Sequence, residues 1–113
     1  DERLAAAPVD TEFLPSVSYI AMPGHTPGHC AVRLTSGSDG LIVAADTVFH
    51  PIISFAHPDW QPASDMDGGV AAASPRRLLD IAATDKLPIV AYHIPFPGVG
   101  RVERHAGAYR WRN

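Results

Sequence analysis

Cysteine is almost absent from the sequence, since Cys30 is the single one among 113 residues. One cysteine cannot form an internal disulfide, and it cannot build a cysteine-rich zinc module. Positive charge is not in excess either, because the formal net charge of −3 gives no basic footprint for nucleic acid. No apolar run approaches the ~20 residues that a membrane span requires. The sequence therefore indicates no nucleic-acid partner and no membrane partner.

The composition favours an ordinary globular protein. Hydrophobic residues make up 46% and charged residues 19% of the chain, unlike a disordered segment. Eleven prolines and nine glycines predict a large share of loop. The length suits one domain or part of one, and we treat 1–113 as a single domain in which 1–16 is a loosely held arm. The cellular compartment, cytoplasm or periplasm, is left open.

Short apolar runs between turn residues predict a mixed sheet. The predicted strands are Val17–Met22, Cys30–Leu34, Leu41–Ala45 and Ile89–His93, followed by a strand-turn-strand unit over Arg101–Arg112. One main helix is expected from about Pro75 to Ala83, after a short segment that starts at Asp67. Asp65 and Asp67 can cap that start. The predicted fold class is α/β (α+β), with about five strands and one main helix against one face.

A stiff loop between two predicted strands holds the first candidate site residue. Two Pro-Gly pairs bracket His25 within Met22–Cys30. Proline fixes φ, and glycine reaches conformations that other residues avoid, so such a loop can hold an imidazole in one orientation. A metal ligand or a catalytic base requires such a fixed orientation. The loop alone is equally compatible with a tight hairpin whose histidines lie on the surface.

Two later stretches favour a site. The apolar run Leu41–Ala45 ends in Asp46, and the run that starts at Ile89 ends in His93, each before a loop. A strand that delivers a polar side chain at its carboxyl end is a common way to build a site. A lone buried aspartate would more often accept structural hydrogen bonds, and a lone histidine would more often be a core residue. Three metal-competent side chains at equivalent places indicate a shared site.

Aromatic residues and a histidine follow two of these positions. Phe49, His50 and Trp60 lie on a proline-rich loop after Asp46, and Phe96 follows His93. We interpret these four residues as candidates for a substrate-facing wall. The alternative for the proline-rich loop is that its aromatic side chains pin it to the core.

The combination of these stretches resembles the second half of the metallo-β-lactamase superfamily. The resemblance lies in Pro23–His29, Ala45–Thr47 and His93, with 21 residues from His25 to Asp46 and 47 from Asp46 to His93. The stretch Ala91–Gly100 is similar to the methyl parathion hydrolase and lactonase-like branch. The resemblance implies half of an αββα sandwich and hydrolysis of small lactone, ester or phosphotriester substrates.

The resemblance also implies roles for individual residues. His25 would ligate one divalent metal, Asp46 would bridge two metals at the catalytic centre, and His93 would complete the second. A bridging hydroxide would be the nucleophile, while Thr26 and His29 would fix the orientation of the ligands without binding the metals. Zinc suits imidazole and carboxylate donors best, and manganese, iron or cobalt are also possible.

One hallmark of that superfamily is missing from the sequence. No His-X-His-X-Asp-His motif is present, although that motif supplies most ligands of the first metal in the family. We therefore expect the chain to be the carboxy-terminal portion of such a hydrolase, to hold one metal or none, and to be inactive alone. Its partner would be the amino-terminal half or a second copy. A non-catalytic association module and a thioester hydrolase of the same superfamily are the alternatives.

Overall fold

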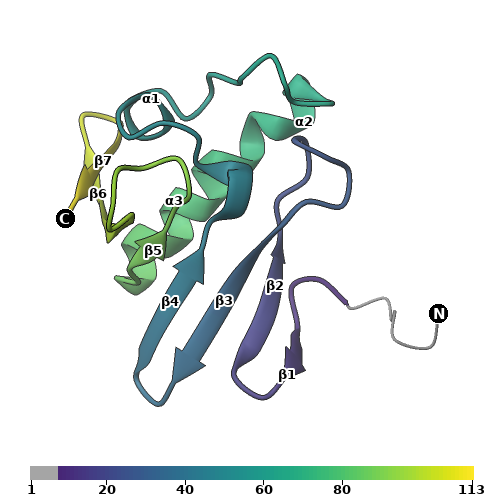
Figure 1. Cartoon of the computed structure of the whole chain (residues 1–113), viewed down its shortest axis with the longest axis vertical. Coiled ribbons are helices and arrows are strands. Elements are labelled where there is room, and N and C mark those ends of the chain that lie inside the picture. Colours follow the sequence, from purple (N-terminus) through teal and green to yellow (C-terminus); the bar gives the residue numbers. More distant parts are fainter. Residues whose placement is uncertain (1–7) are drawn as a thin grey trace.

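The computed structural model describes residues 8–113, and its elements are labelled in Figure 1. The strands are β1 (Glu12–Leu14), β2 (Val17–Ala21), β3 (Cys30–Ser36), β4 (Asp39–Val43), β5 (Ile89–Val90), β6 (Val99–His105) and β7 (Ala108–Arg112). The helices are the 3-10 turn η1 (Ala45–Thr47), α1 (Ile53–Ala56), α2 (Gly68–Ala71) and α3 (Ala73–Asp85). Residues 1–7, the first part of the expected arm, lie outside the described residues.

The seven strands form one sheet in the order of the chain, from β1 to β7. Neighbours are antiparallel except β4 and β5, which are parallel. A parallel pair needs a crossover connection, and the helices between β4 and β5 provide it. Since β2, β4 and β5 run in the same direction, their carboxyl ends share one edge of the sheet. The predicted mixed sheet with one main helix is confirmed.

Helix α3 covers one face of this sheet and builds the core (Figure 1). Leu78 and Leu79 of α3 are fully buried in a cluster with Ile42 and Ile89 of the two parallel strands. Burying an aliphatic side chain of this size contributes roughly 1.5–3 kcal/mol, so this contact is a main source of stability. Pro75 lies in the first turn of α3, where a missing N–H is tolerated. None of the helices in residues 8–113 has the length and apolar character needed to cross a bilayer.

The opposite face of the sheet is also apolar but only partly buried. Cross-strand pairing places Tyr19 beside Val32, Val32 beside Val43, Val43 beside Val90, and Val90 beside Val99. Paired residues share a face, so these five side chains form one row across β2, β3, β4, β5 and β6. None of the five is fully buried, and Val99 is 42% exposed. We call this row the second apolar face.

Four elements differ from the sequence prediction. The predicted strand Leu41–Ala45 is β4 at Asp39–Val43, so Asp46 lies in the 3-10 turn η1 that follows the strand. Part of the expected arm is a strand, because β1 pairs with β2. Helix α1 lies in the proline-rich loop, where no helix was expected. The predicted strand Ile89–His93 is shorter, since β5 ends at Val90 and His93 lies in the following turn. Only two residue pairs join β4 to β5, so the sheet holds this segment over a short length.

Candidate functional site

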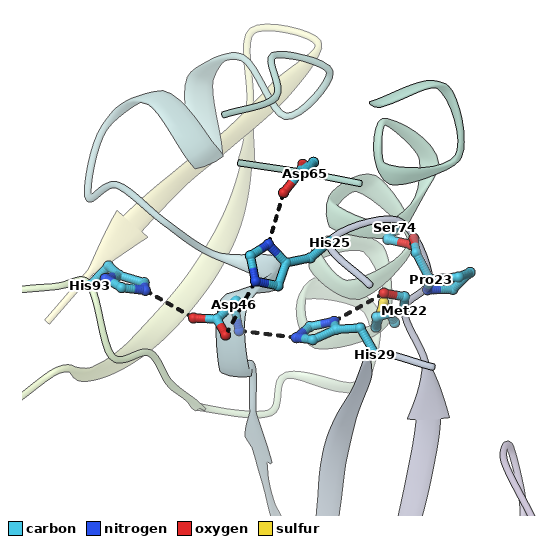
Figure 2. Close-up of polar contacts among 8 residues, drawn as sticks. All are labelled: Met22, Pro23, His25, His29, Asp46, Asp65, Ser74 and His93. Atoms are coloured by element: carbon cyan, nitrogen blue, oxygen red, sulfur yellow. Dashed lines mark hydrogen bonds and ion pairs between the residues drawn. The ribbon is translucent and has the colours of Figure 1, made fainter. Parts of the chain in front are cut away.

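The loop between β2 and β3 holds His25 through close packing against the helices. Gly24 has φ of +130°, and a Cβ there would lie 2.2 Å from the Ala71 Cα, so only glycine fits. Beside it, the Ser74 hydroxyl donates a 2.7 Å hydrogen bond to the Pro23 carbonyl oxygen (Figure 2). These contacts tie the loop to α2 and α3 and fix where the His25 backbone lies.

The three residues singled out as metal ligands lie together at this edge of the sheet (Figure 2). His93 Nε2 lies 2.9 Å from Asp46 Oδ1, and His25 Nε2 lies 3.9 Å from Asp46 Oδ2. The two imidazoles therefore face opposite oxygens of one carboxylate. Their side chains are accessible, with exposed fractions of 32% for His25, 41% for Asp46 and 51% for His93.

His29 supports Asp46 rather than facing the shared carboxylate. Its Nδ1 lies 3.0 Å from the Met22 carbonyl oxygen, which can only accept, so Nδ1 carries the proton. Its Nε2 accepts the Asp46 backbone N–H at 3.2 Å. Both ring nitrogens are thus occupied, which leaves no lone pair for a metal. Thr26 acts through its backbone, because its carbonyl oxygen accepts hydrogen bonds from the Gly24 and His29 amides.

One residue of the site was not recognised in the sequence. Asp65 places Oδ1 3.0 Å from His25 Nδ1, and its side chain is only 5% exposed. The sequence predicts a helix-capping role for both Asp65 and Asp67. Asp67 has that role, since its side chain accepts the Val70 amide at the start of α2. No local signal distinguishes the two, because the partner of Asp65 is 40 residues away in the chain.

The four candidates for a substrate-facing wall have different surroundings. Phe49 lines a small hollow together with His25 and Asp46. His50 accepts the amides of Ile52 and Ile53 through Nδ1, so its imidazole holds the turn that begins α1. Trp60 is 59% exposed and Phe96 is 98% exposed. Contact of these side chains with a substrate remains a prediction.

The donor set suits a shared carboxylate better than a single closed metal site. Within residues 8–113, no three His, Cys, Asp or Glu side chains are arranged to hold one ion. The two histidines instead approach Asp46 from its two oxygens, His93 at hydrogen-bond distance and His25 at 3.9 Å. Imidazole nitrogen and carboxylate oxygen are donors that zinc accepts. The residues present therefore offer zinc a partial set of ligands.

Known proteins with this fold include metal-dependent hydrolases. The dizinc quorum-quenching lactonase AidC, solved with its product N-hexanoyl-L-homoserine, is 30% identical over 94% of this chain and 36% of its own, with a TM-score of 0.86. The hydrolase AbOPH of the beta-lactamase superfamily is 27% identical over 88% of this chain and 35% of its own, with a TM-score of 0.81. An N-acyl homoserine lactone hydrolase, solved with N-hexanoyl-L-homoserine at its catalytic metal centre, is 27% identical over 72% of this chain and 32% of its own, with a TM-score of 0.59. No curated protein sequence matches the chain.

The chain belongs to the metallo-β-lactamase superfamily, whose family model matches residues 6–93. The resemblance to this superfamily is thereby confirmed, and lactonases are among the structural neighbours of the chain. The likeness to methyl parathion hydrolase stays a prediction. The chain spans between 32% and 36% of the length of the three solved relatives described above.

Proposed function

We propose that this chain supplies part of the metal centre of a hydrolase that opens lactones or cleaves related esters. The observation that carries the proposal is the position of His25 and His93 on opposite oxygens of Asp46. A carboxylate that bridges two ions binds one ion through each oxygen, so another ligand of each ion is expected near the corresponding oxygen. The similarity to two lactone-hydrolysing enzymes supports a lactone as substrate, within the wider class of esters and phosphotriesters.

In this proposal each side chain has a distinct role. His25 and His93 would bind one divalent ion each through Nε2, and Asp46 would bind both, with zinc first among the metals and manganese, iron or cobalt as alternatives. Without a metal, His93 Nε2 lies 2.9 Å from the Asp46 carboxylate and carries the proton of that hydrogen bond, so His93 would release this proton on binding an ion. Such ions, when bound, activate water at neutral pH and polarise the attacked carbonyl or phosphoryl oxygen. His29 would keep Asp46 in place through its hydrogen bond to the Asp46 amide. Outer contacts of this kind orient ligands in metal sites.

The test is ring opening of an N-acyl homoserine lactone in the presence of zinc. The chain alone is expected to give no turnover, because it lacks the His-X-His-X-Asp-His ligands. Co-expression with the segment of the same gene that carries this motif is expected to restore turnover. Asp46→Asn should then reduce it by at least about 100-fold, beyond the effect typical of outer-shell partners. Asp39→Asn, at the exposed start of β4, is the control and should leave turnover unchanged.

Two results would contradict this proposal. One is an encoding gene without a His-X-His-X-Asp-His motif. The other is lactone turnover that survives Asp46→Asn in the co-expressed pair.

The second apolar face supports a proposal about the partner. Its five side chains are apolar yet only partly buried, and Leu34 on the same face of β3 is 36% exposed. Contiguous apolar surface of more than a few hundred Å² is uncommon on soluble monomers. The chain also spans about a third of its solved relatives, which is 36% in the case of AidC. The occupant that we propose is the amino-terminal half of the same hydrolase, with a second copy of this chain as the alternative outcome.

Sedimentation velocity at micromolar concentration tests this association. The chain alone is expected to self-associate, and the amino-terminal half is expected to replace that contact with a one-to-one complex. Val43→Glu, in the middle of the second apolar face, should abolish both forms of association. Thr35→Glu, an exposed residue of β3 on the other face, is the matched control and should leave both intact. A monodisperse, folded wild-type monomer that does not bind the amino-terminal half would overturn the proposal.

A further inference from the structure

Asp65 is a buried carboxylate whose hydrogen-bond partner is the ring of His25 (Figure 2). Its side chain is 5% exposed, and its Oδ1 lies 3.0 Å from His25 Nδ1. Burying a carboxylate is costly unless it is hydrogen-bonded. The contact with His25 therefore contributes to holding Asp65 in its buried position. A helix-capping role is not needed to explain why Asp65 is buried.

This contact determines which nitrogen of His25 carries the proton. An ionised carboxylate only accepts hydrogen bonds, so the Nδ1 atom beside it must be the donor. In the neutral ring, Nε2 then has a free lone pair. That Nε2 lies 3.9 Å from Asp46 Oδ2, beyond hydrogen-bond distance, so Asp46 does not act as an acceptor that would draw the proton to Nε2. The His25 ring thus directs an unprotonated Nε2, whose lone pair can bind a metal, toward the candidate site.

The backbone on either side of the contact keeps the carboxylate and the ring in register. The Met66 amide donates to the His25 carbonyl oxygen at 3.3 Å, and the Asp67 amide donates to the Gly24 carbonyl oxygen at 3.0 Å. Together with the side-chain contact, three hydrogen bonds join the segment 65–67 to the His25 loop. The distance between Asp65 and His25 is therefore set by two backbone bonds as well as by the side chains.

We propose that Asp65 is a positioning residue that fixes His25 as the Nδ1–H tautomer and directs its Nε2 toward Asp46. It does not touch the reacting atoms; it acts through His25. The consequence for metal binding rests on the function proposed above, whereas the tautomer of His25 can be measured without any metal. The two ideas can therefore fail separately.

The first experiment measures the His25 tautomer by ¹⁵N NMR of the metal-free chain at about pH 8.5, where an ordinary histidine is neutral. The wild type is expected to show a protonated Nδ1 and an unprotonated Nε2. Asp65→Ala should shift the population toward Nε2–H, because the acceptor is lost. Asp65→Asn should give an intermediate population, since an amide oxygen is a weaker acceptor than a carboxylate. Asp67→Ala removes a carboxylate two residues away that does not contact the ring, and it should leave the tautomer unchanged.

The second experiment measures the zinc affinity of the same variants by competition with a chromophoric indicator. Asp65→Ala is expected to weaken binding about 10- to 100-fold, the range found for partners that orient metal ligands. Asp65→Asn should recover part of this loss, and Asp67→Ala should match the wild type. A purely structural role would lower affinity through unfolding, in proportion to the loss of dispersed amide signals, and Asp65→Asn would not rescue it.

The outcomes separate cleanly. Equal Nδ1–H populations in the wild type, Asp65→Ala and Asp65→Asn would overturn the proposal. Should Asp65→Ala fail to fold, Asp65→Asn decides, because an unchanged tautomer in that variant also overturns it. A graded loss of Nδ1–H from the wild type through Asp65→Asn to Asp65→Ala would support the role of Asp65 in setting the tautomer. A wild-type chain that binds no zinc even together with the amino-terminal half would contradict the proposed metal centre and leave that role intact.

Discussion

Two loops deliver a histidine to the same carboxylate, and the chain supports them unequally. The His25 loop is joined to the segment 65–67 by three hydrogen bonds, two of them made by His25 itself, and the His25 side chain is 32% exposed. His93 lies in the turn after the two-residue strand β5, contacts the carboxylate of Asp46 and is 51% exposed. Its neighbours Tyr92 and Phe96 are 63% and 98% exposed.

This difference shows which side of the site the chain builds alone. A side chain whose ring is held by a buried partner is preorganised, whereas an exposed side chain whose ring contacts one exposed carboxylate is freer to move. The contacts that hold the His25 loop described above all come from residues 8–113. The His93 side exposes aromatic residues that a partner or a substrate could cover, which agrees with the association proposed for this chain.

The largest expected effect comes from the glycine that lets the His25 loop pack against α2. Gly24→Ala should destabilise the chain by at least about 3 kcal/mol, because its Cβ would overlap the backbone of Ala71. In the His93 loop, Gly98→Ala should cost less, about 2 kcal/mol, since φ there is +65° and the added Cβ would lie 2.9 Å from the Ala91 carbonyl oxygen, a milder overlap than at Gly24. Gly28→Ala is the control, because no atom lies within 4 Å of its added Cβ, and it should stay within about 1 kcal/mol of the wild type.

Urea denaturation of these three variants measures the difference. If Gly98→Ala were as destabilising as Gly24→Ala, the two loops would be supported equally, and the comparison would fail.

The next effect comes from removing each imidazole in the metal-free chain. His25→Ala should cost about 1–3 kcal/mol, because it leaves the buried Asp65 carboxylate without its partner. His93→Ala should change the free energy of unfolding by no more than about 0.5 kcal/mol, as usual for an exposed side chain. Both values come from urea denaturation with a chelator present. A larger effect from His93→Ala than from His25→Ala would reverse our assignment of the rigid side.

A smaller effect concerns the base of the His25 loop, where β2 ends. Asp10 accepts the Ala21 amide at 3.1 Å, and Arg77 of α3 bonds to both of these residues. The Ala21 hydrogen bond, with a further contribution from Arg77, holds the pKa of the Asp10 carboxyl below its usual value of 3.8. Folding thus favours the ionised form, which stabilises the chain above that value and loses its effect as pH falls through the lowered pKa.

Asp10→Asn tests this link between pH and stability. At neutral pH the variant should be less stable than the wild type by no more than about 1 kcal/mol, because the pair is exposed. The difference should shrink below pH 3.8 and vanish in stronger acid. Denaturation at several pH values checks this. A difference that is constant down to pH ~2 would mean that the Asp10 charge is not responsible.

Much of the fold and of the candidate site could be predicted because the signals are local. Apolar runs that end in Asp46 and at His93 precede loops that proline and glycine make stiff, and those loops bring both residues to one edge of the sheet. Asp67 precedes the start of α2, and a cap is read directly from such a position.

What the sequence did not reveal depends on contacts between distant segments. Asp65 looks like a second cap until His25, 40 residues earlier in the chain, is seen beside it. The strand β1 has three residues and exists through its pairing with β2, so its own composition gives no strand signal. The start of α1 lies in a proline-rich stretch and is stabilised by two side chains. The Ser54 hydroxyl accepts the amides of residues 49 and 50, and His50 Nδ1 accepts the amides of residues 52 and 53.

The most direct test of the central claim is a zinc titration of the whole chain followed by the side-chain ¹⁵N signals of its six histidines. The account predicts that His25 and His93 both shift first, each through Nε2, because a single ion can bind at either oxygen of Asp46. His57 and His105 should stay unchanged, and Asp46→Asn should remove the response of both site histidines. Binding should be weak and should not exceed one ion, because the remaining ligands of a two-metal site are absent from this sequence. Zinc that binds first at His57 or His105, or two equivalents bound tightly by this chain alone, would contradict the account.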